Sequence, residues 1–280
     1  MFSMGRIILS CFFSILLLVV QAQDMTVASF NIRMKTNADT GNLWDNRKAA
    51  LTNLIKFHGF EVFGIQEGFY AQVQDMKQLL PGFNYVGVGR DDGKQEGEHS
   101  AIFYNEKRFK VLKDGTFWLS ATDTGKPNKG WDAVLPRICT WAIFEDREHG
   151  KRFIFMNTHF DHVGVVARRE SAKLILAKAK EFAQDLPLIL TGDFNVDETN
   201  EAYHTLANSG IVQDVYDLAK VVYAPNSTFN GWGKALKAAE RIDHIFITKP
   251  FTVYRYGILT DTYLGKFPSD HFPVMSELSW

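Results

Sequence analysis

The amino-acid sequence predicts an α/β fold, of the α+β kind, in which β-sheets are sandwiched between helices. Strand-like runs and amphipathic helices alternate in both halves of the chain, and many of the runs are apolar enough to be covered on both faces. The 280 residues are 46% hydrophobic and 22% charged, which is an ordinary globular composition with ample material for a core.

The first half of the chain is predicted to hold short strands and two helices. The strands are expected at residues 26–31, 61–67, 85–89, 101–104 and 117–119. Asp45 is expected to cap the first helix, which runs to about His58. The second helix is expected to end before Pro81 and Gly82, because proline cannot continue a helix.

The second half repeats the plan of strand, polar end and helix, which indicates an internal repeat with pseudo-two-fold halves. Helices are expected at residues 167–184 and 201–208, and strands at 137–144, 152–157, 186–191, 242–248 and 272–278. Gly192 allows a tight turn after one of these strands, and Asp193 and Asn195 then lie on the same side of the extended chain. With no linker between the halves, residues 24–280 are expected to form one large domain or two fused halves.

Residues 1–23 are typical of a secretory signal peptide. Arg6 precedes an apolar run from Ile7 to Val20, and small residues follow at the usual cleavage positions. A membrane anchor is the alternative, but the run is shorter than the ~20 residues that a span needs. We therefore expect an exported protein, periplasmic or secreted. Only Cys139 would remain after cleavage, so no internal disulfide is expected.

The charge of the mature chain is close to neutral. Cleavage removes Arg6 and no acid, which leaves 30 basic and 32 acidic side chains. The balance therefore gives no sign of a strongly basic protein that binds nucleic acid or anionic membranes.

Several polar side chains stand at or beside the ends of apolar strands. They are Asn31, Glu67, His159, Asp193, Asn195, Asp243, Asp270 and His271. In a layered sheet fold, strand ends gather at one rim, where sites are built. Carboxylate and amide oxygens with few nitrogen ligands suit Mg²⁺, or Mn²⁺, better than Zn²⁺. Alone, Asp270-His271 is typical of a turn and Glu67 of a helix cap, but together the residues predict a divalent-cation site with acid–base catalysis.

Short motifs carry these side chains in a fixed order. They are Ser29-Phe-Asn31, Gln66-Glu67, Asn157-Thr-His159, Gly192-Asp-Phe-Asn195, Arg241-Ile-Asp243-His and Ser269-Asp-His271. The set resembles the motifs of the endonuclease/exonuclease/phosphatase superfamily, whose fold is deoxyribonuclease-I-like, over about residues 26–273. The resemblance implies a four-layered α/β/β/α sandwich of two packed mixed sheets with helices outside. Gly89 to Gly93 and Gly130 to Ala133 resemble an exported bacterial branch.

The resemblance also implies which residues bind the metal and activate water. Glu67, with Asn31 nearby, would hold a divalent metal. His271 would act as general base on the attacking water and would be oriented by Asp243. Asp270 would lie beside His271 and assist the metal or the base. A histidine suits this task because it is neutral near pH 7 and a carboxylate fixes its tautomer.

Other residues of the resemblance would act on the phosphate. Asp193 and Asn195 would position the water and the phosphate. His159 would hydrogen-bond a phosphate oxygen or protonate the leaving oxygen. Glu98, in the polar loop before the strand at 101–104, resembles the acid that pairs with this histidine in the deoxyribonuclease branch.

The substrate-binding residues are expected outside the shared motifs. The rim candidates are Arg90, Asp91, Asp92, Trp131, Arg137, Arg168 and Trp232. Trp131 would stack on a base or sugar, or else pack a loop. Arg137 would clamp a phosphate bidentately, or else pair with an acid. Arg90 is the third residue that we expect to contact substrate.

These residues predict a hydrolase that uses a divalent metal to assist attack of water on a phosphodiester or phosphomonoester. The substrate would be a small phosphoester, a lipid head group or nucleic acid. A secreted endonuclease on DNA or RNA fits the motifs, but the near-neutral charge does not favour a long polyanion. A sphingomyelinase-like enzyme would need exposed apolar loops, and no long one is evident. The intact residue set disfavours a non-catalytic binding protein. No obligate protein partner is evident, and a monomer is expected.

Overall fold

The computed structural model describes residues 24–237 and 240–279, so the predicted signal peptide, residues 1–23, lies outside the described residues. Among the described helices, none has the length and apolar character needed to span a membrane. The elements are β1 (Asp24–Asn31), α1 (Trp44–Phe57), β2 (Val62–Gln66), α2 (Tyr70–Leu79), β3 (Phe83–Val86), β4 (Ile102–Asn105), β5 (Phe109–Trp118), β6 (Ile138–Asp146), β7 (Arg152–His159), α3 (Val165–Ala183), β8 (Leu188–Asp193), α4 (Glu201–Ala207), β9 (Gln213–Asp214), α5 (Val215–Leu218), β10 (Val221–Tyr223), the 3-10 turn η1 (Gly231–Gly233), β11 (Asp243–Ile247), β12 (Thr252–Ile258) and β13 (Val274–Ser279).

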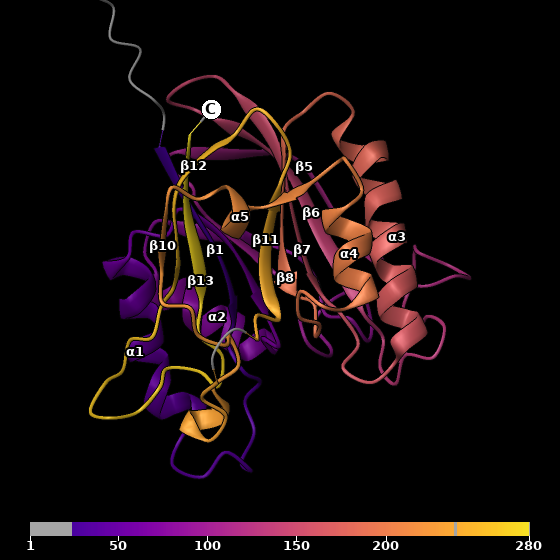
Figure 1. The fold of residues 1–280 in the computed structure, drawn as a ribbon. Coiled ribbons are helices and arrows are strands. Elements are labelled where there is room, and N and C mark those ends of the chain that lie inside the picture. The colour runs from indigo at the N-terminus through magenta and orange to yellow at the C-terminus, as the bar shows by residue number, and fades with distance from the viewer. Residues whose placement is uncertain (1–23, 238–239, 280) are drawn as a thin grey trace, which may run out of the picture.

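Two mixed sheets pack face to face, and helices cover their outer faces. The seven-stranded sheet has the order β10-β12-β13-β1-β2-β4-β3, and the six-stranded sheet has the order β5-β6-β7-β8-β11-β9. In Figure 1, α1 and α2 lie against the first sheet on the left, and α3 and α4 lie against the second sheet on the right. This arrangement confirms the predicted four-layered sandwich.

Each sheet is built around one parallel strand–helix–strand unit. β1 and β2 are parallel and are joined through α1, while β7 and β8 are parallel and are joined through α3. The two units give the halves of the chain a similar plan. Parallel strands end on the same edge of a sheet, so each unit places the residues that follow its strands at one rim.

The apolar core has three parts. Aromatic side chains such as Phe144, Phe153 and Phe155 fill the space between the sheets. α3 and α4 cover the six-stranded sheet through Ile175 and Leu206, while α1 and α2 cover the other sheet in the same way. The sheets therefore form a rigid base for the loops at their rim.

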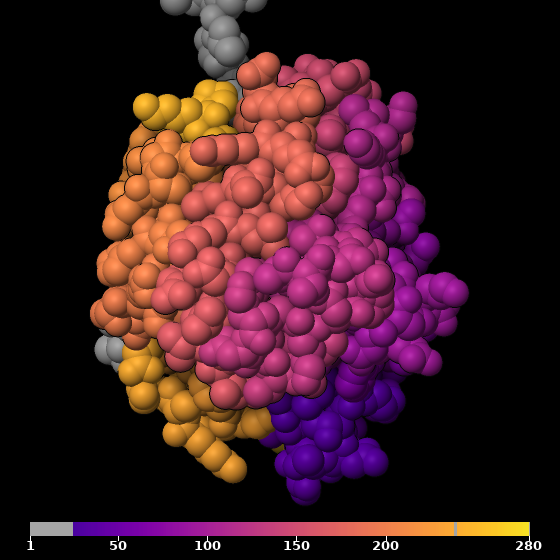
Figure 2. Space-filling view, turned by 90° about the vertical axis from the view of Figure 1, so that its right-hand side faces the viewer, coloured from indigo at the N-terminus to yellow at the C-terminus, as the bar shows by residue number. Residues whose placement is uncertain are grey.

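Figure 2 shows the face that carries α3 and α4. At its lower edge, the indigo segment that follows β1 lies beside the orange and yellow segment that precedes β13, as it also does in Figure 1. One direct contact between them is the hydrogen bond that Lys266 Nζ donates to the Gly41 carbonyl, at 3.0 Å. A loop from the first half of the chain thus meets a loop from the second half near the rim.

Several predicted boundaries differ from the structure. α1 begins after Leu43, so Asp45 lies in the first turn, where its charge still favours the helix dipole. β5 is longer than predicted, and β12 was not predicted at all. Both strands contain a register irregularity, near Val111 in β5 and near Val253 in β12. Such bulges break the alternation on which a strand prediction depends.

Candidate active site

The ends of the central strands meet at one rim and bring the polar residues together. In the seven-stranded sheet, Asn31 at the end of β1 lies opposite Gln66, which precedes Glu67. In the six-stranded sheet, Asp193 at the end of β8 lies opposite His159 on one side and Asp243 on the other. The register of three pairs of strands thus fixes the geometry of the site.

Glu67, Asp193 and His271 form a cluster that fits a metal ion. Their ligand atoms all lie within 4.8 Å of one another. The Asn31 side chain links the two acids, because its Nδ2 donates to Glu67 Oε1 at 3.0 Å and to Asp193 Oδ2 at 2.9 Å. Glu67 has a φ of 64°, which is unusual for a residue other than glycine and turns the chain sharply after β2. Carboxylate oxygens suit a hard divalent cation such as Mg²⁺ or Mn²⁺.

His271 is oriented by a buried carboxylate. Its Nδ1 lies 2.9 Å from Asp243 Oδ2, and its Nε2 lies 3.8 Å from Asp193 Oδ2. Asp243 is held in β11, and its backbone N–H donates to the Thr228 hydroxyl at 3.1 Å. With Nδ1 bound to Asp243, the free nitrogen of His271 is the one that faces the acidic cluster.

The charge state of this cluster depends on what it binds. Burial and the Asp243 charge raise the pKa of Asp193 to about 7, although His271 opposes the rise. Burial lowers the pKa of His271, but the carboxylates of Asp243, Asp193 and Asp270 outweigh burial and raise it to about 10. A bound cation would repel the proton on His271 and favour the ionised acids. The donor set therefore fits a divalent metal chemically as well as geometrically.

His159 stands on the other side of Asp193. Its Nε2 lies 3.5 Å from Asp193 Oδ2, and its Nδ1 lies 3.7 Å from Glu98 Oε2. Glu98 in turn receives two hydrogen bonds from Arg90, at 2.7 and 2.8 Å. Burial, together with the positive charges of Arg137 and Arg90, lowers the pKa of His159 well below its usual value. The structure thus brings Glu98 to His159, with Arg90 holding both oxygens of the acid.

Arg137 is buried at the rim with one donor unused. Its Nε lies 3.3 Å from Asp161 Oδ2, and its Nη2 lies 2.9 Å from His162 Nδ1. Its Nη1 is buried and has no hydrogen-bond partner. Both alternatives predicted for Arg137 are compatible with this geometry, because the ion pair with Asp161 leaves Nη1 available to a ligand.

The candidate site is an open cavity of about 630 Å³. It is lined by Arg33, Met34, Asp39, Glu67, Glu98, Leu135, Arg137, His159, His162, Asp193, Asn195, Phe229, Gly231, Trp232, Ile242, Asp270 and His271. Of the predicted site residues, Asn31 and Asp243 lie directly behind this lining, bonded to Glu67 and His271. A cavity of this volume is typical of a site for a small molecule.

Two residues that we expected to contact substrate do not line this cavity. Arg90 lies behind it and binds Glu98, while the Trp131 side chain is 36% exposed on a loop. Trp232, another predicted rim residue, does line the cavity. Trp232 lies 5.3 Å from the guanidinium of buried Arg47, which fixes the aromatic wall.

Asp270 and Asn195 also reach the cavity by defined contacts. Asp270 Oδ2 lies 3.7 Å from Arg33 Nε, and burial raises the pKa of Asp270, assisted by the nearby Glu67 charge. Asn195 has a φ of 51°, its N–H donates to Asp193 Oδ1 at 2.9 Å, and its Nδ2 donates to the Phe160 carbonyl at 3.0 Å. The turn after β8 is therefore locked by the same residues that line the site.

Three residues that support the site were not predicted from the sequence. Asp161 and His162, which hold Arg137, belong to the stretch that follows His159. The sequence could have indicated them, because Asp161 and His162 follow an apolar strand as the predicted site residues do. Arg33 had no such signal, because its partners are set by the tertiary fold.

A four-layered sandwich with carboxylates and histidines at the ends of its central strands is the arrangement of a deoxyribonuclease-I-like protein. The chain belongs to the endonuclease/exonuclease/phosphatase family, whose model matches residues 28–271. Members of this family include phosphatases and exonucleases, and hydrolysis is their common chemistry. The predicted resemblance is thereby confirmed for the superfamily.

Solved structures and known proteins support this membership. A mannosyl-6-phosphatase from Bacteroides thetaiotaomicron VPI-5482 is 47% identical, with a TM-score of 0.89, and the match covers 91% of this chain and 100% of that one. An endonuclease/exonuclease/phosphatase family protein from the same species is also 47% identical, with a TM-score of 0.90, over 93% of this chain and 99% of that one. The Ccr4 exoribonuclease subunit of Emericella nidulans is 23% identical over 84% of this chain, which spans 48% of that protein.

Proposed function

We propose that the chain is a divalent-metal-dependent hydrolase that removes the phosphate of a small sugar phosphate. The observation that carries this proposal is the cavity itself, in which the acidic cluster of Glu67 and Asp193 lies between His271 and His159, with Arg137 at the rim. This arrangement offers a place for a cation, a base and a phosphate within one small cavity.

Glu67 and Asp193 would hold the metal, with Asn31 fixing both acids. A divalent cation, Mg²⁺ or Mn²⁺, would neutralise charge that develops on the phosphate oxygens. His271 would take a proton from the attacking water through Nε2, while Asp243 fixes the tautomer at Nδ1. His159 would donate a hydrogen bond to a phosphate oxygen from the opposite side of Asp193.

Arg137 favours a monoester over a diester. A buried N–H without a partner costs about 1–3 kcal/mol, which a ligand oxygen bound to Nη1 would offset. A phosphomonoester carries a further charged oxygen that a diester replaces with a second ester group. A guanidinium in the same cavity as the metal cluster therefore gains more from the monoester.

The sugar is proposed from the similarity to the mannosyl-6-phosphatase, which is 47% identical along its full length. The aromatic wall at Trp232 and Phe229 supports a sugar, because a ring face can pack against the apolar side of a pyranose. We also propose that the protein is exported and acts as a monomer, from the leader-like residues 1–23 and the self-contained cavity.

A substrate panel tests this function. Residues 24–280 would be purified and incubated with Mg²⁺ and either mannose 6-phosphate, bis-p-nitrophenyl phosphate, supercoiled DNA or sphingomyelin. We expect release of phosphate from mannose 6-phosphate, no nicking of DNA and loss of activity with a chelator. Nicking of the plasmid without turnover of the sugar phosphate would replace the proposal with the secreted-nuclease alternative.

An Arg137→Lys variant tests the monoester preference. Lysine keeps the charge but loses the planar fork, so we expect kcat/KM for mannose 6-phosphate to fall about tenfold or more. The loss on bis-p-nitrophenyl phosphate should be smaller. Arg169→Lys, at a half-buried position of α3 that does not line the cavity, is the matched control and should behave as wild type. An equal loss on both substrates would contradict a role in reading the monoester.

A further inference from the structure

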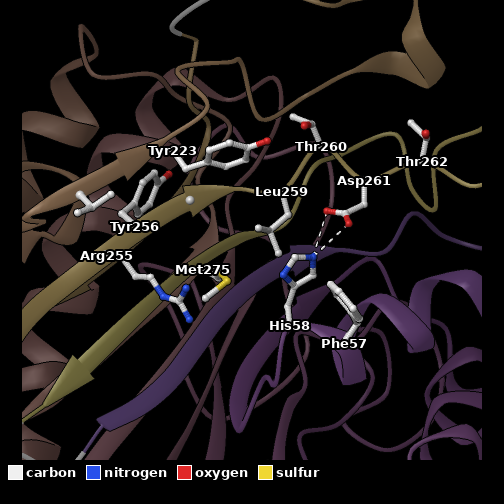
Figure 3. A pocket seen from close by; sticks show the side chains of 12 residues that line it. Phe57, His58, Tyr223, Arg255, Tyr256, Leu259, Thr260, Asp261, Thr262 and Met275 are labelled. Atoms are coloured by element: carbon white, nitrogen blue, oxygen red, sulfur yellow. Dashed lines mark hydrogen bonds and ion pairs between the residues drawn. The ribbon is translucent and has the colours of Figure 1, made fainter.

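A second hollow, of about 820 Å³, lies on the outer face of the seven-stranded sheet. It is lined by Phe57, His58, Val221, Tyr223, Arg255, Tyr256, Gly257, Leu259, Thr260, Asp261, Thr262 and Met275. None of these residues lines the catalytic cavity. The hollow is found between the end of α1 and strands β10 and β12, at the left edge of Figure 1, and Figure 3 shows its side chains.

Large apolar side chains stand exposed around this hollow. Phe57 is 84% exposed, Val221 62% and Tyr223 61%. Tyr223 lies against Gly257, where an added Cβ would sit 3.8 Å from Tyr223 Cδ1, so the glycine leaves a flat strand surface beside the ring. A group of exposed rings and aliphatic side chains in a concave site is typical of a surface that binds a ligand.

The charged groups of the hollow are paired within the protein, so they leave little net charge for a ligand. His58 Nε2 lies 3.1 Å from Asp261 Oδ2, and Arg255 Nε lies 2.6 Å from Glu277 Oε2. In Figure 3, Tyr223, Arg255 and the His58–Asp261 pair surround the same space. Such a site does not favour an anion, which would need an unpaired cation. It suits a neutral ligand that has an apolar face and many hydroxyl groups.

The hollow adjoins a second groove along α1. Phe57, Asp261 and Thr262 also line an adjoining groove that runs along α1 to Pro268. The Pro268 carbonyl accepts a hydrogen bond from Arg47, the residue that lies against Trp232 in the wall of the catalytic cavity. The groove and the catalytic cavity are thus connected through a buried residue and share no lining residue.

We propose that this hollow is a saccharide-binding site outside the catalytic centre. The ring of Tyr223 would pack against the C–H face of a pyranose, and the His58–Asp261 pair with Thr260 would bind neighbouring hydroxyls. The site would hold a neutral saccharide apart from the catalytic cavity. Binding of a neutral saccharide does not require the proposed hydrolysis, although the choice of a sugar as ligand also draws on that function.

Binding of neutral trisaccharides to the whole protein tests the site. Mannotriose, maltotriose, cellotriose and chitotriose would each be titrated into wild type and Tyr223→Ala while NMR spectra are recorded. We expect one of them to bind with a Kd of about 1 mM, and about fivefold or more weaker in Tyr223→Ala. Tyr254→Ala removes a tyrosine of the neighbouring strand β12 that does not line the hollow, and this variant should bind as wild type.

Each outcome decides one part of the proposal. No binding by wild type to any of the four sugars, or equal binding by Tyr223→Ala, would overturn it. So would sedimentation of wild type as a dimer that Tyr223→Ala dissociates, since the hollow would then be an interface between two copies. If saccharide binding depends on Tyr223 but the protein hydrolyses no sugar phosphate, the proposed function is wrong and the binding site stands. Tyr223→Ala should leave turnover of mannose 6-phosphate unchanged.

Discussion

A buried hydrogen bond with Asp243 orients the ring of His271, and the ring of Phe229 packs against it edge-on. The carboxylate fixes Nδ1, so Nε2 is the only nitrogen left to act on water. Asp193 lies between His271 and His159, and the Nε2 atom of each histidine lies within 4 Å of Asp193 Oδ2. At the scale of single residues, the proposed function would use two histidines with different environments, since nearby acids raise the pKa of His271 while burial and arginines lower that of His159.

Replacing His271 by alanine should remove the general base and leave the fold intact. We expect turnover of mannose 6-phosphate to fall about 10²–10⁴-fold, which is the usual contribution of a positioned base. Steady-state kinetics on the metal-loaded variant would measure the loss, and circular dichroism would check folding. His204→Ala, on the exposed side of α4, is the control and should retain full activity. Wild-type turnover in folded His271→Ala would refute the assignment.

The polar residues at strand ends could be predicted from the sequence, because alternation and strand ends are local features. The structure brings Asn31, Glu67, Asp193 and His271 together as that reasoning expected. Partners of the arginines could not be predicted in the same way. Arg90 pairs with Glu98 and does not line the cavity. The conformation of its loop decides which acid it contacts, and sequence periodicity does not reveal that conformation.

At the scale of elements, a buried polar network fixes the two sheets to each other below the site. Gln66 of β2 donates to Asn157 of β7 at 2.7 Å, and Thr191 of β8 donates to the same amide oxygen at 3.0 Å. The Asn157 amide also donates to the Ile65 carbonyl at 2.8 Å. The network crosses from one sheet to the other, so it sets how the rims of the two sheets meet.

A Gly64→Ala substitution should break this network. An added Cβ at Gly64 would collide with the side chains of Asn157 and Thr191, so the sheets could not approach as closely. Overpacking with lost buried hydrogen bonds should lower the free energy of unfolding by at least about 2 kcal/mol. Chemical denaturation would measure the change. Gly125→Ala, in an exposed loop, is the control, and equal stability of both variants would contradict the role of the network.

Asp214 anchors the far side of β11 and makes stability depend on pH. Its carboxylate accepts hydrogen bonds from Tyr203 and Arg241, both at 3.0 Å. Burial raises the pKa of Asp214, but contacts with His244 and Arg241 outweigh burial and lower it to about 2. Because the folded pKa lies below the unfolded value of 3.8, the stabilisation is present above about pH 4 and is lost as the pH falls toward 2.

An Asp214→Asn variant tests this dependence. We expect it to lower the free energy of unfolding by about 2 kcal/mol at pH 7, and the difference from wild type to shrink between about pH 4 and pH 2. Urea denaturation at a series of pH values would follow the difference. Asp185→Asn changes an exposed acid and should have little effect at any pH. A difference that stays constant down to pH 2 would contradict the cause given for the shift.

Elements with a regular pattern could be predicted, and irregular ones could not. The helices that cover the two sheets and the central strands follow clear apolar periodicity. The edge strand β5 carries exposed Lys110 and Asp114, so its apolar pattern is weak. β9 and β10 are only two and three residues long, too short for any periodicity to show.

At the scale of the whole molecule, each of the two packed sheets contributes part of the candidate site. Glu67 follows a strand of one sheet, while Asp193 ends a strand of the other. The cavity exists only because both sheets end at the same rim. We expect the loops around this rim to choose the substrate, and the sequence alone does not predict that choice because loop positions follow from the complete fold.

Phosphate release as a function of Mg²⁺ concentration, in wild type, Glu67→Gln and His271→Ala, tests the proposed metal-dependent catalysis most directly. Wild type should be inactive without a divalent cation and reach a plateau as Mg²⁺ is added. Glu67→Gln should need about tenfold or more Mg²⁺ for half-maximal turnover, because it weakens the metal site. His271→Ala should reach only a far lower plateau, even at saturating Mg²⁺, because the base is missing. Turnover that a chelator does not reduce, or a Glu67→Gln midpoint equal to that of wild type, would contradict metal-dependent catalysis at this cluster.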